Sequence, residues 1–312
     1  MAAAEPRRIA PPLEDLIGIL GLTLEKVYFL RYKKKIDRVR DGILSKQTHK
    51  PLRVVQISDS HLFASLDGRL LGLCTEDSLK LVLDKVRKEQ PDLDLILATG
   101  DISQDASPEA YQRFHRYLNA FGVPNYWLQG NHDITAPMIT TLGGHTRLSP
   151  CVIDRDGWRI IMLNSSVEHQ VPGKFTPQEL DFLTRSLDES KDRHVMVCLH
   201  HHPVPMGCKW LDTQVVRNAD EFLDIADRYS HIRAIVWGHV HQESDNLRKG
   251  VRMLSVPSTC VQFKALSDDF AIEEDLNPGY RWFHLHADGT LDTAVSRVEG
   301  VKFVVDWSVK GY

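Results

Sequence analysis

Metal-capable side chains follow five apolar runs of this sequence. In chain order the five motifs are Asp59-Ser60-His61, Gly100-Asp101, Gly130-Asn131-His132-Asp133, His200-His201-His202-Pro203 and Gly238-His239-Val240-His241. Asp, Asn and His offer the oxygen and nitrogen donors that suit Mn, Fe, Zn or Mg. Each motif alone is explained as well by a turn or an incidental polar patch. Five of them, each at the end of an apolar run, indicate one shared metal site.

A sheet is needed to bring these motifs together, and the sequence pattern predicts one. Short β-branched, apolar runs predict strands, and longer amphipathic segments predict helices. We expect strands at 52–58, 93–100, 125–130, 151–165, 195–200, 232–238 and 251–258, and helices at 78–91, 108–121, 176–189 and 217–229. The alternation predicts an α/β (α+β) layered fold. Because ligands bind at the carboxyl ends of strands in open α/β sheets, the motifs are expected at one edge.

Local turn signals refine this arrangement. Asp156-Gly157 and Asp288-Gly289 each lie between apolar runs and predict antiparallel hairpins. Glycines precede three of the metal-capable residues, at positions 100, 130 and 238. Glycine permits backbone conformations that other residues disfavour, so we expect tight turns that aim the next side chain at the metal.

Composition bounds the class of protein. The chain has 312 residues and a net charge of −4, which gives no general attraction to nucleic acid or anionic membranes. No nucleic-acid partner is therefore expected. The five cysteines are odd in number and form no C-x-x-C, so we expect free thiols in a reducing compartment.

Residues 1–50 differ from the rest of the chain. An apolar stretch is followed by RYKKKIDRVR, a basic run at helical spacing. We predict a helical, basic extension that is either a solvated helix or one packed on the domain. Weak contact with a membrane or a protein through residues 13–44 is the alternative. The segment lacks a secretory h-region and a membrane-spanning length of apolar residues, so we expect a soluble cytoplasmic protein.

The ordered motif set resembles the calcineurin-like metallophosphoesterase superfamily, over roughly residues 53–260. That resemblance implies a domain at 51–312, built as a β-sandwich flanked by helices, with a dinuclear metal site at the sheet edge. It implies two ligand sets that share Asp101 as a bridge: Asp59, His61 and His241 for one ion, and Asn131, His201 and His239 for the other. His201 is chosen because the family's histidine lies two residues before proline. His200 and His202 are the alternatives.

The expected chemistry combines this resemblance with general principles. Two metal ions roughly 3.5–4 Å apart clamp a phosphate and make hydroxide available near neutral pH. The resemblance implies catalytic roles for Asp101, Asn131 and His132, with His132 stabilising the transition state or protonating the leaving oxygen. Substrate contacts are expected from His61, Asn131, His132 and His241. Asp133 is expected either to orient His132 by a hydrogen bond or to cap a helix.

Longer segments narrow the resemblance to bacterial class III 3′,5′-cyclic AMP phosphodiesterases. They include SDSHLFASLDGRLLG, GDISQD, LHHHPVPMGCKWLD, GHVHQE and VPSTCVQF. The resemblance implies hydrolysis of 3′,5′-cyclic AMP to 5′-AMP, two divalent ions (Fe and Mn first, with Mn, Zn or Mg as alternatives), and a monomer or homodimer. Other phosphodiesters, phosphomonoesters and a non-catalytic scaffold are the rival functions. Arg69, Trp210 and Phe263 are candidates for nucleotide contact, with loop packing as the alternative.

Overall fold

The computed structural model describes residues 50–144, 147–302, 304–306 and 308. The chain divides after Lys50, and the architecture below is that of the unit that begins at Pro51. The predicted helical extension at 1–50 and its contact segment at 13–44 therefore lie outside the described residues. Among the residues described, no helix combines the length and the apolar character needed to cross a membrane.

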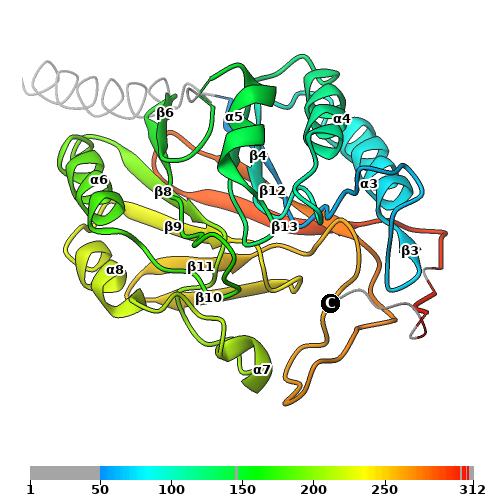
Figure 1. Cartoon of the computed structure of the whole chain (residues 1–312). Helices are drawn as coiled ribbons and strands as arrows, with labels where there is room; N and C mark the ends of the chain where they lie inside the picture. The colour runs from blue at the N-terminus through cyan, green and yellow to red at the C-terminus, as the bar shows by residue number, and fades with distance from the viewer. Residues whose placement is uncertain (1–49, 145–146, 303, 307, 309–312) are drawn as a thin grey trace, which may run out of the picture. The chain divides into compact units, whose positions relative to one another are not determined.

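Two mixed sheets form the centre of the domain (Figure 1). The five-stranded sheet has the order β13 (Leu291–Arg297), β12 (Gly279–Leu285), β1 (Leu52–Ile57), β4 (Leu95–Thr99) and β5 (Asn125–Leu128). The six-stranded sheet has the order β10 (Ser244–Arg248), β11 (Val251–Ser255), β9 (Ile232–Trp237), β8 (His194–Leu199), β7 (Trp158–Met162) and β6 (Cys151–Arg155). In the six-stranded sheet the four inner strands are parallel, and each edge strand is antiparallel to its neighbour. In the five-stranded sheet β1, β4 and β5 are parallel, whereas β1 pairs antiparallel with β12 and β12 with β13.

Apolar side chains between the two sheets hold them face to face. Leu95 and Leu97 of β4 point into this core, where they join Trp158 and Met162 of β7 and Phe283 of β12. All five side chains are fully buried. Residues that alternate along a strand face opposite sides of the sheet, so the remaining apolar residues must be covered from outside. The result is a β-sandwich whose inner faces form one apolar core.

Helices cover both outer faces. On the five-stranded sheet, α3 (Thr75–Glu89), α4 (Pro108–Asn119) and α5 (Thr135–Leu142) pack against the outward side chains of β1 and β4. On the six-stranded sheet, α6 (Pro177–Asp188) and α8 (Ala219–Ala226) do the same. Both α4 and α6 carry proline at the first helical position, where its missing N–H costs no bond. The predicted helix-flanked sandwich is confirmed.

Three kinds of element were not predicted from the sequence pattern. β10 reads SDNLR and is mostly exposed at a sheet edge, so it has no apolar alternation. The two-residue strands β2 (Arg69–Leu70) and β3 (Leu73–Cys74) are too short for a period to show. The helix α5 and the single-turn α7 (Lys209–Asp212) lie within segments expected to be loops. The hairpins at Asp156-Gly157 and Asp288-Gly289 are both present.

Candidate metal centre

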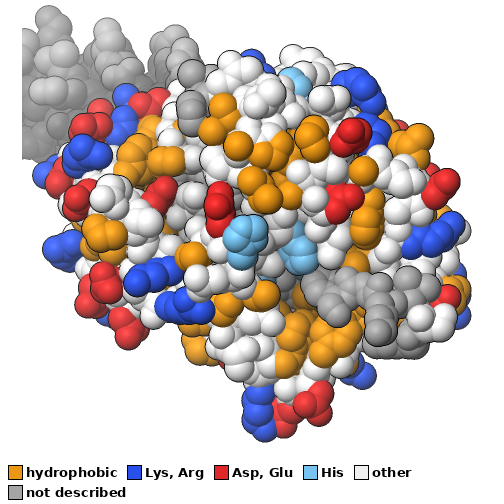
Figure 2. Space-filling model, in the orientation of Figure 1, with side chains coloured by type: hydrophobic (Ala, Val, Ile, Leu, Met, Phe, Trp, Pro, Cys, Tyr) orange, Lys and Arg blue, Asp and Glu red, His pale blue; other side chains and the backbone are white. Residues whose placement is uncertain are grey.

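The five motifs converge at one edge of the sandwich. Three of them follow the carboxyl ends of β1, β4 and β5, which are neighbours in one sheet. The other two follow β8 and β9, which are neighbours in the other sheet. Figure 2 shows histidine atoms reaching the surface near the middle of this face, between apolar side chains. The predicted convergence at the strand ends is confirmed, and both sheets contribute to it.

The backbone at the motifs adopts conformations that ordinary residues avoid. Left-handed φ angles of 47° to 64° occur at five metal-capable residues: Asp59, His61, Asp101, His239 and His241. Such conformations cost of order 1–3 kcal/mol each for non-glycine residues and persist where the surroundings enforce them. Backbone hydrogen bonds enforce two of them here, from Asp59 N to Gly100 O (3.0 Å) and from His61 N to Asp101 O (2.9 Å). This concentration of strain marks the edge as a functional site.

The three glycines serve the site in two ways. Gly100 has φ of +95°, which matches the expected turn. Gly130 and Gly238 have no left-handed φ, and they are needed for space instead. A Cβ atom at Gly130 would overlap Asp101 Oδ1, and one at Gly238 would lie 2.8 Å from Asp59 Oδ2. Two of the glycines therefore allow a carboxylate to approach the backbone closely.

His61 and His241 present unprotonated nitrogens to one another. His61 Nδ1 lies 2.6 Å from Gln104 Oε1, and His241 Nδ1 lies 2.8 Å from the carbonyl oxygen of Val261. Both Nδ1 atoms must donate, so the Nε2 atoms of the neutral rings carry lone pairs. These Nε2 atoms are 3.2 Å apart, and Asp59 Oδ1 lies 3.4 Å from that of His241. Burial lowers the pKa of His61 to about 3, which keeps its ring neutral.

A bound cation would remove the repulsion among the facing atoms of His61, His241 and Asp59. Two lone pairs and a carboxylate that face one another repel unless a positive charge lies among them. Two nitrogen ligands of one tetrahedral ion lie about 3.3 Å apart, given metal–nitrogen bonds of roughly 2.0–2.1 Å. The observed 3.2 Å separation fits that spacing. Asp59, His61 and His241 thus suit a divalent metal.

A second group of acceptors surrounds His200. Its Nδ1 donates to Thr99 O at 2.8 Å, which leaves the Nε2 lone pair toward Asn131 Oδ1 at 3.2 Å and Asp101 Oδ2 at 3.3 Å. Nearby, His239 Nε2 is buried and has no hydrogen-bond partner among the described residues. An orphaned buried nitrogen is costly without a ligand. This group also suits a divalent metal.

The electrostatics of this group favour a positive charge at His200. Burial disfavours the charged ring, but the charge of Asp101 and a hydrogen bond to it raise the pKa of His200 to about 9. Burial likewise opposes ionisation of Asp101, yet His200 and the neighbouring histidines hold the pKa of that carboxyl well below its usual range. Asp101 Oδ2 also lies 3.7 Å from His61 Nε2, so this one carboxylate reaches both groups.

The prediction that selected His201 does not agree with its contacts. His201 Nε2 lies 2.9 Å from the carbonyl oxygen of Val171, and its Nδ1 lies 2.8 Å from Ser165 Oγ. Both ring nitrogens are therefore used by the loop at 164–174. A ligand atom of His201 does lie within 4.8 Å of those of His200 and His239, but proximity without a free lone pair does not make a ligand. His200 is the residue that faces the carboxylate and the amide.

Asp133 does not cap a helix, which was one of its two expected roles. Its carboxylate accepts backbone N–H bonds from Gly130, Ile102 and Ser103, and a hydroxyl bond from Tyr111. The N-cap of α5 is Ile134, whose side chain caps nothing. Burial and the nearby charge of Asp101 raise the pKa of Asp133 to about 6. Asp133 holds together the two loops that carry Asp101 and Asn131, and its contact with His132 stays a prediction.

His132 stands at the opening of the site. It is half-buried, and its ring meets that of His61 edge to face with centroids 5.0 Å apart. Its backbone N–H donates to Asp101 Oδ1 at 2.9 Å. Half-exposure beside the two acceptor groups leaves the ring able to reach a bound phosphate ester.

The three candidates for nucleotide contact, Arg69, Trp210 and Phe263, lie in different surroundings. Arg69 donates to Gly72 O at 2.9 Å, within its own hairpin, which supports the loop-packing alternative. Phe263 lies at the site, because its ring stacks on that of His241 with centroids 4.1 Å apart and an angle of 3°. Trp210 packs on Phe263 from behind, with centroids 5.0 Å apart. A cavity of about 190 Å³ borders His241 and Phe263.

Some residues of the site gave no signal in the sequence. Gln104 fixes the tautomer of His61, yet it lies three residues beyond the Gly-Asp motif in an ordinary polar loop. The carbonyl oxygens of Thr99 and Val261 do the same for two other histidines. Every residue has a carbonyl oxygen, so residue type could not have revealed these partners.

Known proteins resemble this chain in both sequence and fold. The family model described as calcineurin-like phosphoesterase matches residues 52–243. A 3′,5′-cyclic adenosine monophosphate phosphodiesterase CpdA of Pseudomonas aeruginosa is 45% identical over 265 residues, which is 85% of this chain and 97% of that protein. A 3′,5′-cyclic-nucleotide phosphodiesterase of Nostoc is 39% identical over 250 residues, which is 80% of this chain and 93% of that protein.

Solved structures agree at the level of the fold. A dimetal phosphatase from Danio rerio superposes with a TM-score of 0.58 at 15% identity, covering 80% of this chain and 100% of that one. The purple acid phosphatase PPD1 from yellow lupin gives 0.57 at 14% identity, covering 80% of this chain and 52% of that one. With the family match over more than half of the chain and relatives aligned over nearly their whole length, this protein belongs to the calcineurin-like phosphoesterase family.

Proposed function

We propose that this protein hydrolyses the phosphodiester of 3′,5′-cyclic AMP to give 5′-AMP at a dinuclear metal site. One observation carries the proposal: two groups of buried nitrogen and oxygen atoms that share Asp101 lie at distances suited to divalent ions. The substrate is suggested by the relatives, several of which are named as phosphodiesterases of that nucleotide and align over nearly their full length.

The proposed ligands follow the contacts, with one change from the sequence prediction. Asp101 serves both ions, and His200 takes the place first given to His201. The full sets are Asp59, His61, Asp101 and His241 for one ion, and Asp101, Asn131, His200 and His239 for the other. Carboxylate, amide and imidazole donors suit Fe and Mn, and they also accept Mn alone, Zn or Mg.

The protein's own groups position the substrate and move its protons. When bound, two divalent ions would offset the charge of the phosphate oxygens and supply hydroxide near neutral pH. Asn131 would hold a phosphate oxygen through its amide N–H groups. His132 would donate a ring proton to the 3′ oxygen as the ester bond breaks, since that oxygen leaves as an alkoxide. The rings of His61 and His241 border the same space and would exclude water from the phosphate.

Other phosphate esters are the second candidate, because the fold alone does not fix the substrate. A product assay separates the possibilities. Purified protein loaded with Mn²⁺ is given 3′,5′-cyclic AMP, 3′,5′-cyclic GMP, a 2′,3′-cyclic nucleotide, bis-p-nitrophenyl phosphate and a phosphomonoester, with and without chelator. We expect metal-dependent release of 5′-AMP. Turnover of bis-p-nitrophenyl phosphate without turnover of cyclic AMP would refute cyclic AMP as the substrate. The proposed dinuclear metal site would still stand.

His132→Ala tests the proposed acid. The variant is expected to retain both metals and to lose roughly 10²–10⁴ in kcat, the usual contribution of general acid–base catalysis. His115→Ala is a matched control, because His115 is also half-buried and lies on α4, outside both ligand groups. An unchanged kcat in His132→Ala would refute the role.

Three further statements remain predictions of this proposal. They are a cytoplasmic location, a monomeric or homodimeric state, and a weak membrane or protein contact through residues 13–44. Size-exclusion chromatography with light scattering tests the second. Flotation of the full chain with anionic vesicles, compared with the chain from residue 51, tests the third.

A further inference from the structure

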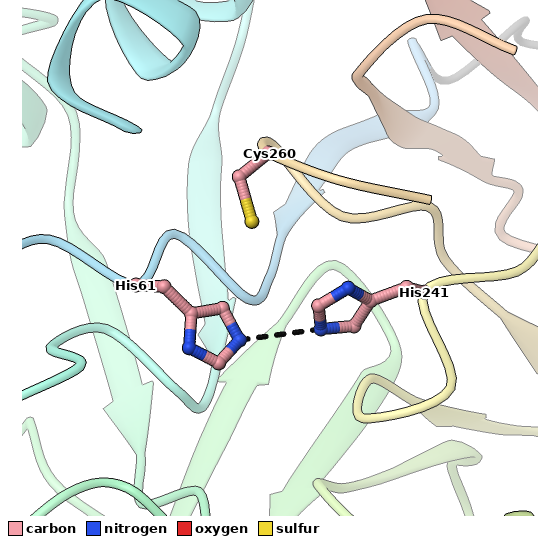
Figure 3. Close-up of side chains that lie close together, drawn as sticks. All are labelled: His61, His241 and Cys260. Atoms are coloured by element: carbon pink, nitrogen blue, oxygen red, sulfur yellow. Dashed lines mark hydrogen bonds between the residues drawn. The ribbon is translucent and has the colours of Figure 1, made fainter. Parts of the chain in front are cut away.

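A cysteine lies beside the first group of metal ligands. Cys260 follows β11, and its side chain is fully buried. Its Sγ lies with one ring nitrogen each of His61 and His241, all three atoms within 4.8 Å of one another. Figure 3 shows the sulfur directed toward the space beside the two rings. Histidine nitrogen and cysteine sulfur are both ligands that zinc takes in proteins.

Hydrogen bonds hold this thiol in place. Cys260 N donates to Ser258 Oγ at 2.8 Å, and Ser258 Oγ lies 3.0 Å from Cys260 Sγ. The sulfur is also 3.4 Å from the carbonyl oxygen of Asp59, which the serine hydroxyl reaches at 2.7 Å. The serine O–H can turn from the carbonyl to the sulfur, so a thiolate formed here would have a donor. The loop is thus built to accommodate sulfur in either protonation state.

We propose that His61, His241 and Cys260 form a binding site for thiophilic divalent ions such as Cd²⁺ and Zn²⁺. The ion forms a bond to sulfur as the S–H bond breaks, and the proton leaves to solvent. Asp59, whose Oδ1 lies 3.4 Å from His241 Nε2, supplies a fourth ligand. The two histidines then belong to an ion held by sulfur, and the harder ion needed for hydrolysis is displaced. Such ions therefore inhibit the enzyme.

A redox role for the same cysteine fits less well. Reactive cysteines are exposed and have a low thiol pKa, whereas Cys260 is buried and burial raises the pKa of its thiol to about 12. A metal ion needs no free thiolate in advance, because coordination itself removes the proton.

The inference rests on the first ligand group of the proposed function, but it does not depend on the substrate. Its experiment can therefore use binding alone. Metal-free full-length protein is titrated with Cd²⁺, and the ultraviolet thiolate-to-cadmium charge-transfer band is recorded together with proton release. Wild type, Cys260→Ser and the control Cys74→Ser are compared. Cys74 is the control because it is partly exposed and lies outside both ligand groups.

We expect wild type and Cys74→Ser to develop the band with one equivalent of Cd²⁺ and to release about one proton. Cys260→Ser should lack the band. Persistence of the band in Cys260→Ser, or its absence in wild type, overturns the proposal. Mn²⁺ binding by Cys260→Ser, followed by electron paramagnetic resonance, shows that the variant is folded; if it is not, Cys260→Ala is used in its place.

Inhibition gives an independent readout. With Mn²⁺ present and bis-p-nitrophenyl phosphate as substrate, Cd²⁺ should inhibit wild type at a concentration at least about tenfold lower than Cys260→Ser, as expected for loss of one ligand. Equal inhibition of both overturns the proposal. If the protein proves inactive on every ester, the charge-transfer band still decides the question, so failure of the proposed function is distinguishable.

Discussion

Asp133 joins the two loops that carry the shared carboxylate and its neighbouring amide. Its oxygens accept the N–H groups of Gly130 at 2.9 Å and of Ile102 and Ser103 at 3.1 Å, and the hydroxyl of Tyr111 at 3.1 Å. Two of these donors, Ile102 and Gly130, are adjacent in sequence to the proposed ligands Asp101 and Asn131. The substitution Asp133→Ala would leave four buried donors without an acceptor, so it should damage both the fold and the metal site.

The contacts set the size of the effect. A hydrogen bond to a charged group contributes about 1.5–3 kcal/mol, and an orphaned buried donor costs about 1–3 kcal/mol. The four contributions share one carboxylate, so they do not add, and water can enter part of the space. We therefore expect Asp133→Ala to lower the free energy of unfolding by roughly 3–5 kcal/mol. Metal affinity should fall about 10–100-fold, as for other residues that position ligands.

The assay is urea unfolding of the chelator-treated protein, followed by calorimetric titration with Mn²⁺. Measurements are made at about pH 8, where the carboxyl is ionised because its pKa is about 6. Tyr111→Phe is the matched control, since it removes one of the four donors and should cost only about 1 kcal/mol. A loss below about 1 kcal/mol in Asp133→Ala with unchanged Mn²⁺ affinity would show that the carboxylate does not hold the loops.

Three other substitutions test separate parts of the structure. His200→Ala should lose one of two bound Mn²⁺ ions in elemental analysis while His201→Ala keeps both, and the opposite pattern would restore the first assignment. Gly130→Ala should abolish turnover because its Cβ displaces the bridging carboxylate, whereas Gly157→Ala, with nothing within 4 Å, should stay active. Burial raises the pKa of Glu179 to about 7, so the folded state keeps a proton that the unfolded chain releases above about pH 4.5. The free energy of unfolding should therefore fall as pH rises from about 4.5 to 7, by at most roughly 3 kcal/mol, and Glu179→Gln should lack this decline in denaturation curves.

Much of the architecture can be predicted from the amino-acid sequence. Apolar runs such as 52–58 and 93–100 are long enough to cross a sheet, and each is followed at once by side chains of types that can bind metals. Strands buried on both faces read as continuous apolar stretches, which is why the inner strands were predictable. The polar edge strand β10 was not, because an exposed edge requires no apolar alternation. The candidate metal ligands were predicted from their position at the strand ends.

Tertiary structure alone decided which of three adjacent histidines faces Asp101 and Asn131. Alternation in extended chain places His200 and His202 on one side and His201 on the other, but it does not say which side is the site. Packing of the second sheet against the first turns His200 toward Asp101 and leaves His201 to the loop carbonyl of Val171. The same packing brings Cys260 beside His61 from far along the chain. The sequence by itself determined the kind of chemistry and its strand-end location, whereas the direction of each side chain depended on contacts between distant segments.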